Sequence, residues 1–98
     1  MKNKKVNLAK VADTRTILEE AQKAVYGDRN EDYGTVTQNF GTIADFWSVI
    51  LKNKVTPEQV GLCMAAVKMA RQMYKPKRDN LVDLAGYAAT LEKLSNGE

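Results

Sequence analysis

Apolar residues return along the chain at intervals of three and four residues, the period of a helix that is packed on one side. No stretch alternates between apolar and polar positions as a half-buried strand does. The helical period marks four segments, at about residues 13–26, 35–52, 56–74 and 79–94. Because the connections between them are short, sequential helices are expected to be antiparallel neighbours. We therefore predict an all-α fold, a four-helix bundle.

Capping signals support these limits. Asp13 or Thr14 is the expected N-cap of the first helix. The third helix has the clearest start, because Thr56 is followed by proline at the first helical position and by glutamine three residues later, which is a capping box. Asp79 or Asn80 is expected to cap the fourth helix.

The predicted third helix is apolar on most sides between Val60 and Ala70. Such a helix is either central in the bundle or part of an oligomer interface. Because a bundle of this size buries a modest core, we expect a homo-oligomer. Met64, Met69 and Met73 fit an adaptable surface for another protein, and core packing explains them equally well.

Glycines mark two further features. Gly41 interrupts the second helix, and close packing of a neighbour is the expected reason. The polar segment Gly27–Gly34 is long for a connection in a helical bundle, and displayed loops of this kind often carry function. Within it, Arg29 and Tyr33 are candidates either to close over a ligand or to fasten the loop to the bundle.

Composition excludes several classes of protein. The chain has 98 residues, the size of one domain, and lacks the roughly 20 consecutive apolar residues of a membrane span. The polar, basic start is not that of a secretion signal. The absence of histidine excludes Ser–His and Cys–His catalytic pairs and His-based metal sites. Cys63 has no cysteine to pair with, fits a reducing cytoplasm, and is expected to be a buried, inert thiol.

Fifteen basic and twelve acidic residues give a net charge of +3. Four of the lysines lie in the first ten residues, which divides the chain into a flexible basic tail, residues 1–12, and a single all-α domain, residues 13–95. A nucleic-acid-binding domain usually carries a basic stripe on a folded face. We therefore expect a solvated tail, with a tether for nucleic acid as the second interpretation. Nucleic acid is thus not the favoured partner, and no membrane partner is expected.

Asp79, Asp83 and Tyr87 follow one another at four-residue intervals and share one side of the fourth helix. Two carboxylates at this spacing are candidate ligands for Mg²⁺, which prefers oxygen donors. The alternative is structural, with Asp79 as an N-cap and Asp83 paired with Arg71 across the hairpin of the last two helices.

Lys68 and Arg71 lie one turn apart on the third helix. Arginine binds phosphate through its forked donors and lysine through its point charge. Both are candidate ligand-binding residues for a phosphate-bearing molecule, together with Arg29, Tyr33 and Tyr87. The alternative for Lys68 and Arg71 is that they keep their charges in solvent while their stems cover apolar surface.

Short motifs occur in a fixed order over about residues 14–90. They are Gly27-Asp28-Arg29, Asp32-Tyr33-Gly34, Asn39-Phe40, Ile43-Ala44, Trp47-Ser48, Lys68-Met69-Ala70-Arg71 and Asp83-Leu84-Ala85-Gly86-Tyr87-Ala88. In this order they resemble a family of small, functionally uncharacterised proteins of bacteriophages and prophages. The resemblance implies a phage or prophage origin and a location in the host cytoplasm, and it implies no assigned activity.

The chain is more distantly similar to the all-α NTP pyrophosphohydrolases of the MazG-like type. That resemblance implies a helical, oligomeric, Mg²⁺-dependent protein with an E-x-x-E pair on one helix and an E-x-x-D pair on a later one. Here Glu20 is followed three residues later by Lys23, and Asp79 and Asp83 are four residues apart. The four-carboxylate set is not reproduced, so a site reduced to these two aspartates needs other ligands.

Three functions remain after this reasoning. The first is a phage protein that binds a nucleotide or another phosphate-bearing ligand, with Mg²⁺-dependent, pyrophosphohydrolase-like turnover left open. The second is a non-catalytic protein that sequesters a nucleotide against host defences. The third is a helical module for protein–protein interaction.

Overall fold

The computed structural model describes residues 15–27 and 29–98, and every regular element within them is a helix. The long helices are α2 (Ile17–Tyr26), α4 (Val36–Leu51), α5 (Pro57–Tyr74) and α6 (Arg78–Ser95). The short helix α3 (Arg29–Tyr33) lies inside the segment that was predicted to be a loop. The predicted tail, residues 1–12, and the expected caps Asp13 and Thr14 lie outside the described residues.

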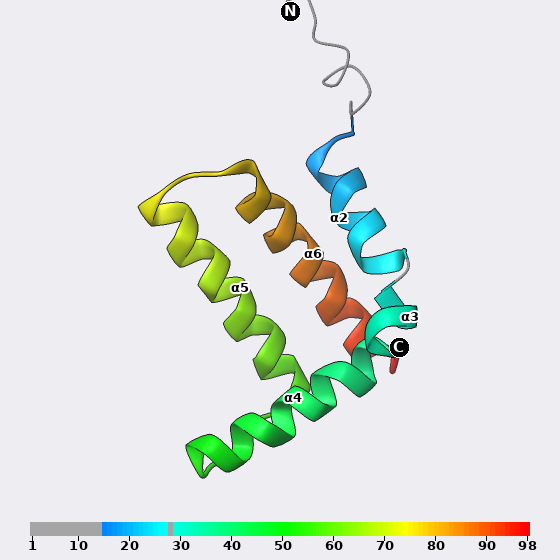
Figure 1. Ribbon diagram of the computed structural model, residues 1–98, viewed down its shortest axis with the longest axis vertical. Helices are drawn as coiled ribbons and strands as arrows, with labels where there is room; N and C mark the ends of the chain where they lie inside the picture. Colours follow the sequence, from blue (N-terminus) through cyan, green and yellow to red (C-terminus); the bar gives the residue numbers. More distant parts are fainter. Residues whose placement is uncertain (1–14, 28) are drawn as a thin grey trace, which may run out of the picture.

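Helices α2, α6 and α5 lie side by side in that order, and α4 crosses one end of this layer (Figure 1). Helices α5 and α6 are antiparallel neighbours, as their short connection predicted. The same expectation was wrong for α2 and α4, which do not contact each other because α3 lies between them. Helix α6 is central, because it contacts α2, α4 and α5. The all-helical prediction is thus confirmed, but α5 does not occupy the central position that was one of its two expected places. Its far side lies at the edge of the layer.

The same capping device begins three of the long helices. In each, a threonine hydroxyl accepts from the backbone N–H three residues later, and the side chain there accepts from the threonine N–H, at 2.8–3.2 Å. The pairs are Thr16–Glu19, Thr35–Gln38 and Thr56–Gln59. Only the last was predicted. Each cap stabilises its helix by roughly 1 kcal/mol.

Helix α6 begins differently from the prediction. It starts at Arg78, and its N-cap, Lys77, makes no side-chain cap, so Asp79 and Asn80 are not the N-cap. Instead, Gln72 of α5 reaches across the hairpin. Its Oε1 accepts from the Lys77 backbone N–H and from the Asn80 Nδ2, both at 3.0 Å. The start of α6 is therefore held by a neighbouring helix rather than by its own sequence.

The core lies where α4 crosses the ends of α5 and α6. Its buried members are Val36, Phe40, Ala44, Val60 and Leu94. A Cβ at Gly61 would lie 2.9 Å from the Leu91 Cδ2, so this glycine allows α5 and α6 to approach closely. A Cβ at Gly41 would meet no described residue within 4 Å, so the close neighbour expected there was wrong. Among the described residues, no helix has the length and apolar content required to cross a membrane.

Candidate functional site

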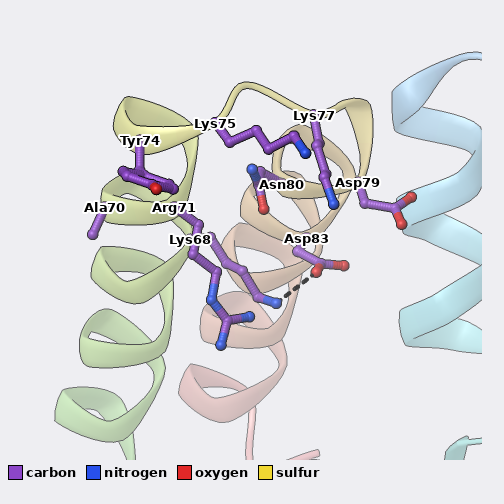
Figure 2. Close-up of a pocket in the computed structure, with 9 residues that line it drawn as sticks. All are labelled: Lys68, Ala70, Arg71, Tyr74, Lys75, Lys77, Asp79, Asn80 and Asp83. Carbon is purple, nitrogen blue, oxygen red and sulfur yellow. Dashed lines mark ion pairs between the residues drawn. The ribbon is translucent and has the colours of Figure 1, made fainter.

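A pocket of about 570 Å³ lies at the end of the α5–α6 hairpin, beside the linker that joins the two helices (Figure 2). Its lining residues are Lys68, Ala70, Arg71 and Tyr74 from α5, Lys75 and Lys77 from the linker, and Asp79, Asn80 and Asp83 from α6. The linker turns here because Pro76 cannot continue a helix. Lys75 accordingly adopts an extended backbone, with φ −143° and ψ 98°.

One ion pair lies in this pocket, on the side away from the linker (Figure 2). The Lys68 Nζ lies 2.9 Å from the Asp83 Oδ2, and the Lys68 side chain is only 16% exposed (Figure 2). The charge of Lys68 is therefore largely balanced within the protein. The alternative in which Asp83 pairs across the hairpin is confirmed in kind, but the partner is Lys68 and not Arg71.

The charged side chains that line the pocket are mostly positive. Four basic side chains line it against two acidic ones, which leaves an excess of two positive charges. Within residues 15–27 and 29–98, Arg71, Lys75 and Lys77 form no ion pair. Figure 2 shows Lys75 and Lys77 extending from the linker, with Asp79 lying on the α2 side of α6, away from the Lys68–Asp83 pair. An anion entering the pocket would thus meet three basic groups without carboxylate partners.

Tyr74, a residue that is 92% exposed, also lines this pocket. An exposed aromatic ring beside basic groups can stack on a nucleobase. Sequence reasoning left Tyr74, Lys75 and Lys77 out of the candidate site. The available signal in the sequence was the cluster of basic residues Lys75, Lys77 and Arg78 around Pro76.

The pocket brings together four of the predicted site residues: Lys68, Arg71, Asp79 and Asp83. Tyr87 is not among its lining residues and packs, partly buried, against the core. Asp79 and Asp83 share the pocket, but the part of the chain that the structure describes contains no group of three His, Cys, Asp or Glu residues that could hold a metal ion. These two carboxylates, one of them paired with Lys68, do not make a Mg²⁺ site on their own.

Arg29 and Tyr33 line a separate pocket of about 550 Å³ between α2 and α3. The Arg29 guanidinium lies 5.3 Å from the centre of the Tyr33 ring and 5.7 Å from that of Phe40, within the range of a cation–π contact. Its buried Nε has no hydrogen-bond partner within the described part of the chain. These contacts fasten α3 to the core, which was one of the two roles expected for Arg29.

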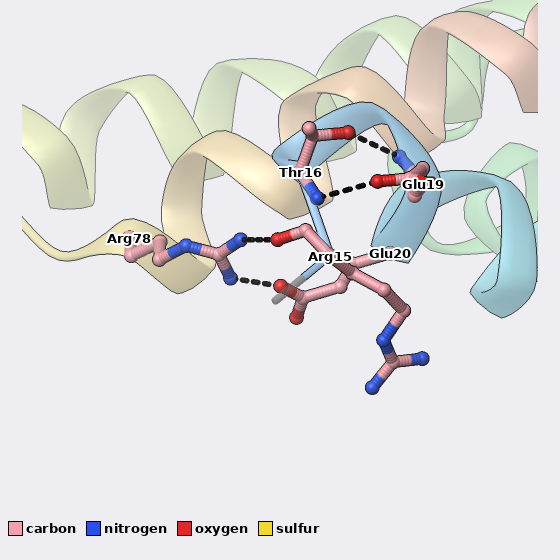
Figure 3. Close-up of polar contacts among 5 residues, drawn as sticks. All are labelled: Arg15, Thr16, Glu19, Glu20 and Arg78. Atoms are coloured by element: carbon pink, nitrogen blue, oxygen red, sulfur yellow. Dashed lines mark hydrogen bonds and ion pairs between the residues drawn. The ribbon is translucent and has the colours of Figure 1, made fainter. Parts of the chain in front are cut away.

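Polar contacts of Arg78 join the start of α6 to α2 (Figure 3). Arg78 forms an ion pair with Glu20 through its Nη1, and its Nη2 donates to the Arg15 carbonyl oxygen at 3.0 Å. The positive charge of Arg78 is therefore balanced by Glu20 within the protein. In the adjoining capping box, hydrogen bonds from the Thr16 backbone N–H and hydroxyl lower the pKa of Glu19.

Comparison with known proteins places this sequence in a family. Residues 16–95 match the family model DUF6378, described as a domain of unknown function. The chain is 37% identical over 82 residues to the Gene 55 protein of Mycobacterium phage D29 and 38% identical over 81 residues to that of Mycobacterium phage L5. These alignments cover 83% and 81% of this chain, and 54% and 52% of the phage proteins. The chain therefore spans about half the length of these relatives.

No solved structure matches the chain. The family match covers most of the sequence, including all the residues of the α5–α6 pocket. This chain therefore belongs to DUF6378, a family of unknown function with relatives among phage proteins.

Proposed function

We propose that this protein binds a nucleotide or a related phosphate-bearing small molecule in the α5–α6 pocket. The observation that carries the proposal is the set of Arg71, Lys75 and Lys77, three basic side chains around one pocket that have no carboxylate partner among the described residues. A volume of about 570 Å³ is within the usual range for small-molecule sites.

The lining residues suggest how a nucleotide is held. The guanidinium of Arg71 can donate two parallel hydrogen bonds to a phosphate, while Lys75 and Lys77 contribute mobile positive charges. Tyr74 offers a stacking surface for the base, a contact worth roughly 1–3 kcal/mol in single-stranded nucleic-acid complexes. The Lys68–Asp83 pair forms the floor, where it limits the excess positive charge.

Binding without turnover is the function that the residues favour. Hydrolysis in the manner of the MazG-like enzymes requires a set of carboxylates around Mg²⁺, and the pocket supplies Asp79 and Asp83 alone. We therefore place sequestration of a nucleotide, as a phage defence against its host would need, ahead of pyrophosphohydrolysis. Such a role would be carried out in the host cytoplasm, where nucleotides are abundant.

The test is thermal unfolding with inorganic phosphate, nucleoside monophosphates and nucleoside triphosphates, each with Mg²⁺ and with EDTA. A ligand at a hundred times its Kd raises the free energy of unfolding by about 2.7 kcal/mol. We expect stabilisation by nucleotides that survives EDTA and is lost in Arg71→Gln. Lys52→Gln, which removes an exposed lysine outside the pocket, is the matched control and should behave as the wild type. A flat unfolding temperature across the panel would refute the proposal.

Turnover is tested on the same samples. Release of phosphate or pyrophosphate with Mg²⁺ that disappears in Asp83→Asn would replace sequestration by hydrolysis as the function. Equal background rates in the two proteins, together with binding, would support a non-catalytic role.

A further inference from the structure

The outward face of α5 carries no charge over four turns. Nine residues between 59 and 73 are exposed, and Val67 and Arg71 lie to one side of this face. The other seven lie along it: Gln59, Leu62, Cys63, Ala66, Met69, Ala70 and Met73. We name them the outer face. Cys63 was expected to be buried, and its exposure is a correction. A surface helix normally turns charged or polar residues to solvent, so an exposed, largely apolar face of this length is typical of a surface that another molecule covers.

An apolar groove continues the outer face at the N-terminal end of α5. It has a volume of about 550 Å³ and is lined by Trp47, Leu51, Asn53, Lys54, Val55, Gln59, Leu62 and Cys63. The Ser48 hydroxyl fixes the α4–α5 turn beside it, since its Oγ accepts from the Val55 N–H at 2.8 Å and donates to the Ala44 carbonyl at 2.7 Å. These hydrogen bonds hold the groove in place at the N-terminal end of the outer face.

The spacing of the outer face identifies the occupant. Leu62, Ala66, Met69 and Met73 follow one another at intervals of four, three and four residues, the repeat of two helices packed side by side. Around a two-fold axis midway between Ala66 and Met69, an antiparallel copy places Met69 opposite Ala66 and Met73 opposite Leu62. Large residues then meet small ones at the centre, which favours interdigitated packing. A parallel copy would set Ala66 against Ala66 and leave a gap.

We propose that two copies of this chain associate through their α5 helices, antiparallel about that axis, and that Met73 of each copy enters the groove of the other. The alignment brings Met73 to the level of Leu62, which is one wall of the groove. Met73 is 88% exposed in the single chain, so its side chain is free to do so. The arrangement is isologous, and it buries both grooves and both outer faces at once.

The area available suits a dimer at the small end of specific interfaces. Five large side chains on this surface are on average about 70% exposed: Leu51, Leu62, Met69, Met73 and Tyr74. With the smaller residues between them, they offer roughly 500 Å² per copy, or about 1,000 Å² in total. Because α5 is the edge helix of the layer, the rest of the fold leaves its length accessible to a second copy. We expect a dimer that dissociates at micromolar concentrations.

Sedimentation velocity of the full chain over a range of concentrations tests the association. The wild type should shift from monomer to dimer, and Met73→Glu should weaken the association at least tenfold while keeping its helical circular dichroism. Leu18→Glu is the matched control, because it charges an apolar residue of similar exposure on α2, away from α5. The control should dimerise as the wild type does. A wild type that stays monomeric, or a Met73→Glu protein that dimerises normally, would overturn the proposal.

Disulfide trapping tests the direction of the helices. In a Cys63→Ser background, Leu62→Cys and Met73→Cys proteins should cross-link when they are mixed, and neither should cross-link alone. Cross-linking of the Leu62→Cys protein with itself would mean that the helices run parallel, and the antiparallel arrangement would be wrong.

Discussion

Replacing Asp83 by asparagine separates binding from catalysis, because the two functions predict opposite results. The substitution removes one of the two negative charges of the pocket and releases Lys68 from its partner. The pocket then gains one unit of positive charge. If phosphate is held by Arg71, Lys75 and Lys77, Asp83→Asn should therefore tighten binding.

The size of the effect follows from Coulomb's law. A unit charge about 7 Å from a phosphate contributes ~0.6 kcal/mol in bulk water and ~2.4 kcal/mol at an effective dielectric constant of 20. Asp83 is 43% exposed, which places the pocket nearer to the first value. We expect about 1 kcal/mol, which is roughly a fivefold decrease in Kd. The loss of the ion pair should lower the free energy of unfolding by less than ~1 kcal/mol, since one partner is exposed to solvent.

The assay is isothermal titration of the nucleotide that stabilises the protein best, with EDTA present, at about 50 mM and about 150 mM salt. The gain in affinity should shrink at the higher salt, because screening weakens the charge effect. Lys68→Met is the paired variant. It removes the cation and leaves Asp83 unpaired, so its Kd should rise instead.

An Asp83→Asn protein that binds more weakly than the wild type would refute the reasoning. That result would mean that the carboxylate itself contacts the ligand or a metal ion bound with it. The hydrolytic alternative would then regain its main candidate residue.

Three predictions concern the scaffold that positions the pocket. Gly41→Ala should raise the free energy of unfolding by about 1 kcal/mol in denaturant melts, because alanine has the higher helix propensity and its methyl group would meet no described residue. Gly61→Ala is the comparison and should not stabilise the protein, since its methyl group would crowd the α5–α6 contact. Hydrogen bonds from Thr16 lower the pKa of Glu19, so its stabilisation is fully present above about pH 4.5 and is lost as the pH falls through the lowered pKa. The difference in unfolding midpoint between the wild type and Glu19→Gln should therefore shrink in acid, and a constant difference would contradict this. Gln72→Ala should cost about 1–2 kcal/mol because two donors at the start of α6 lose their acceptor, while Gln22→Ala, on the exposed side of α2, should cost almost nothing.

Local sequence rules account for the helices and their starts to different degrees. The capping box at Thr56 was predicted. The same Thr-x-x-Glu/Gln pattern also occurs at Thr16 and Thr35, and applying it there would have given the N-caps of α2 and α4. The start of α6 could not be found in this way. This start is held by Gln72, a residue of another helix that accepts from the Lys77 N–H and the Asn80 Nδ2, and only the tertiary fold brings these groups together.

The centre of the fold and the composition of the pocket were harder to predict for the same reason. Helix α5 is apolar on both sides, and periodicity cannot say which side faces α6 and which faces another molecule. The linker residues Lys75 and Lys77 enter the pocket because the chain reverses at Pro76, whereas Tyr87, at helical register with Asp83, turns to the core. Charge and spacing located the hairpin correctly, and its packing decided which side chains share a cavity.

Tyr74 connects the pocket with the proposed dimer. Its exposed ring lines the pocket and flanks the outer face, so a second copy that packs on α5 restricts the ring in the position from which it can stack on a base. Ordering of this side chain before the ligand arrives lowers the entropic cost of binding. The dimer should therefore bind nucleotide more tightly than the monomer, and by linkage the ligand should strengthen dimerisation by the same factor.

This coupling can be measured with Met73→Glu, which blocks association at a residue outside the pocket. We expect its Kd for nucleotide to be severalfold higher than that of the wild type measured above the dimer dissociation constant. In sedimentation experiments, saturating nucleotide should shift the wild-type protein toward the dimer by a matching factor. If the second copy orders the Tyr74 ring, the affinity of the pocket for nucleotide must change on dimerisation. Equal Kd values for the monomeric variant and the dimer would therefore show that the pocket and the outer face act independently.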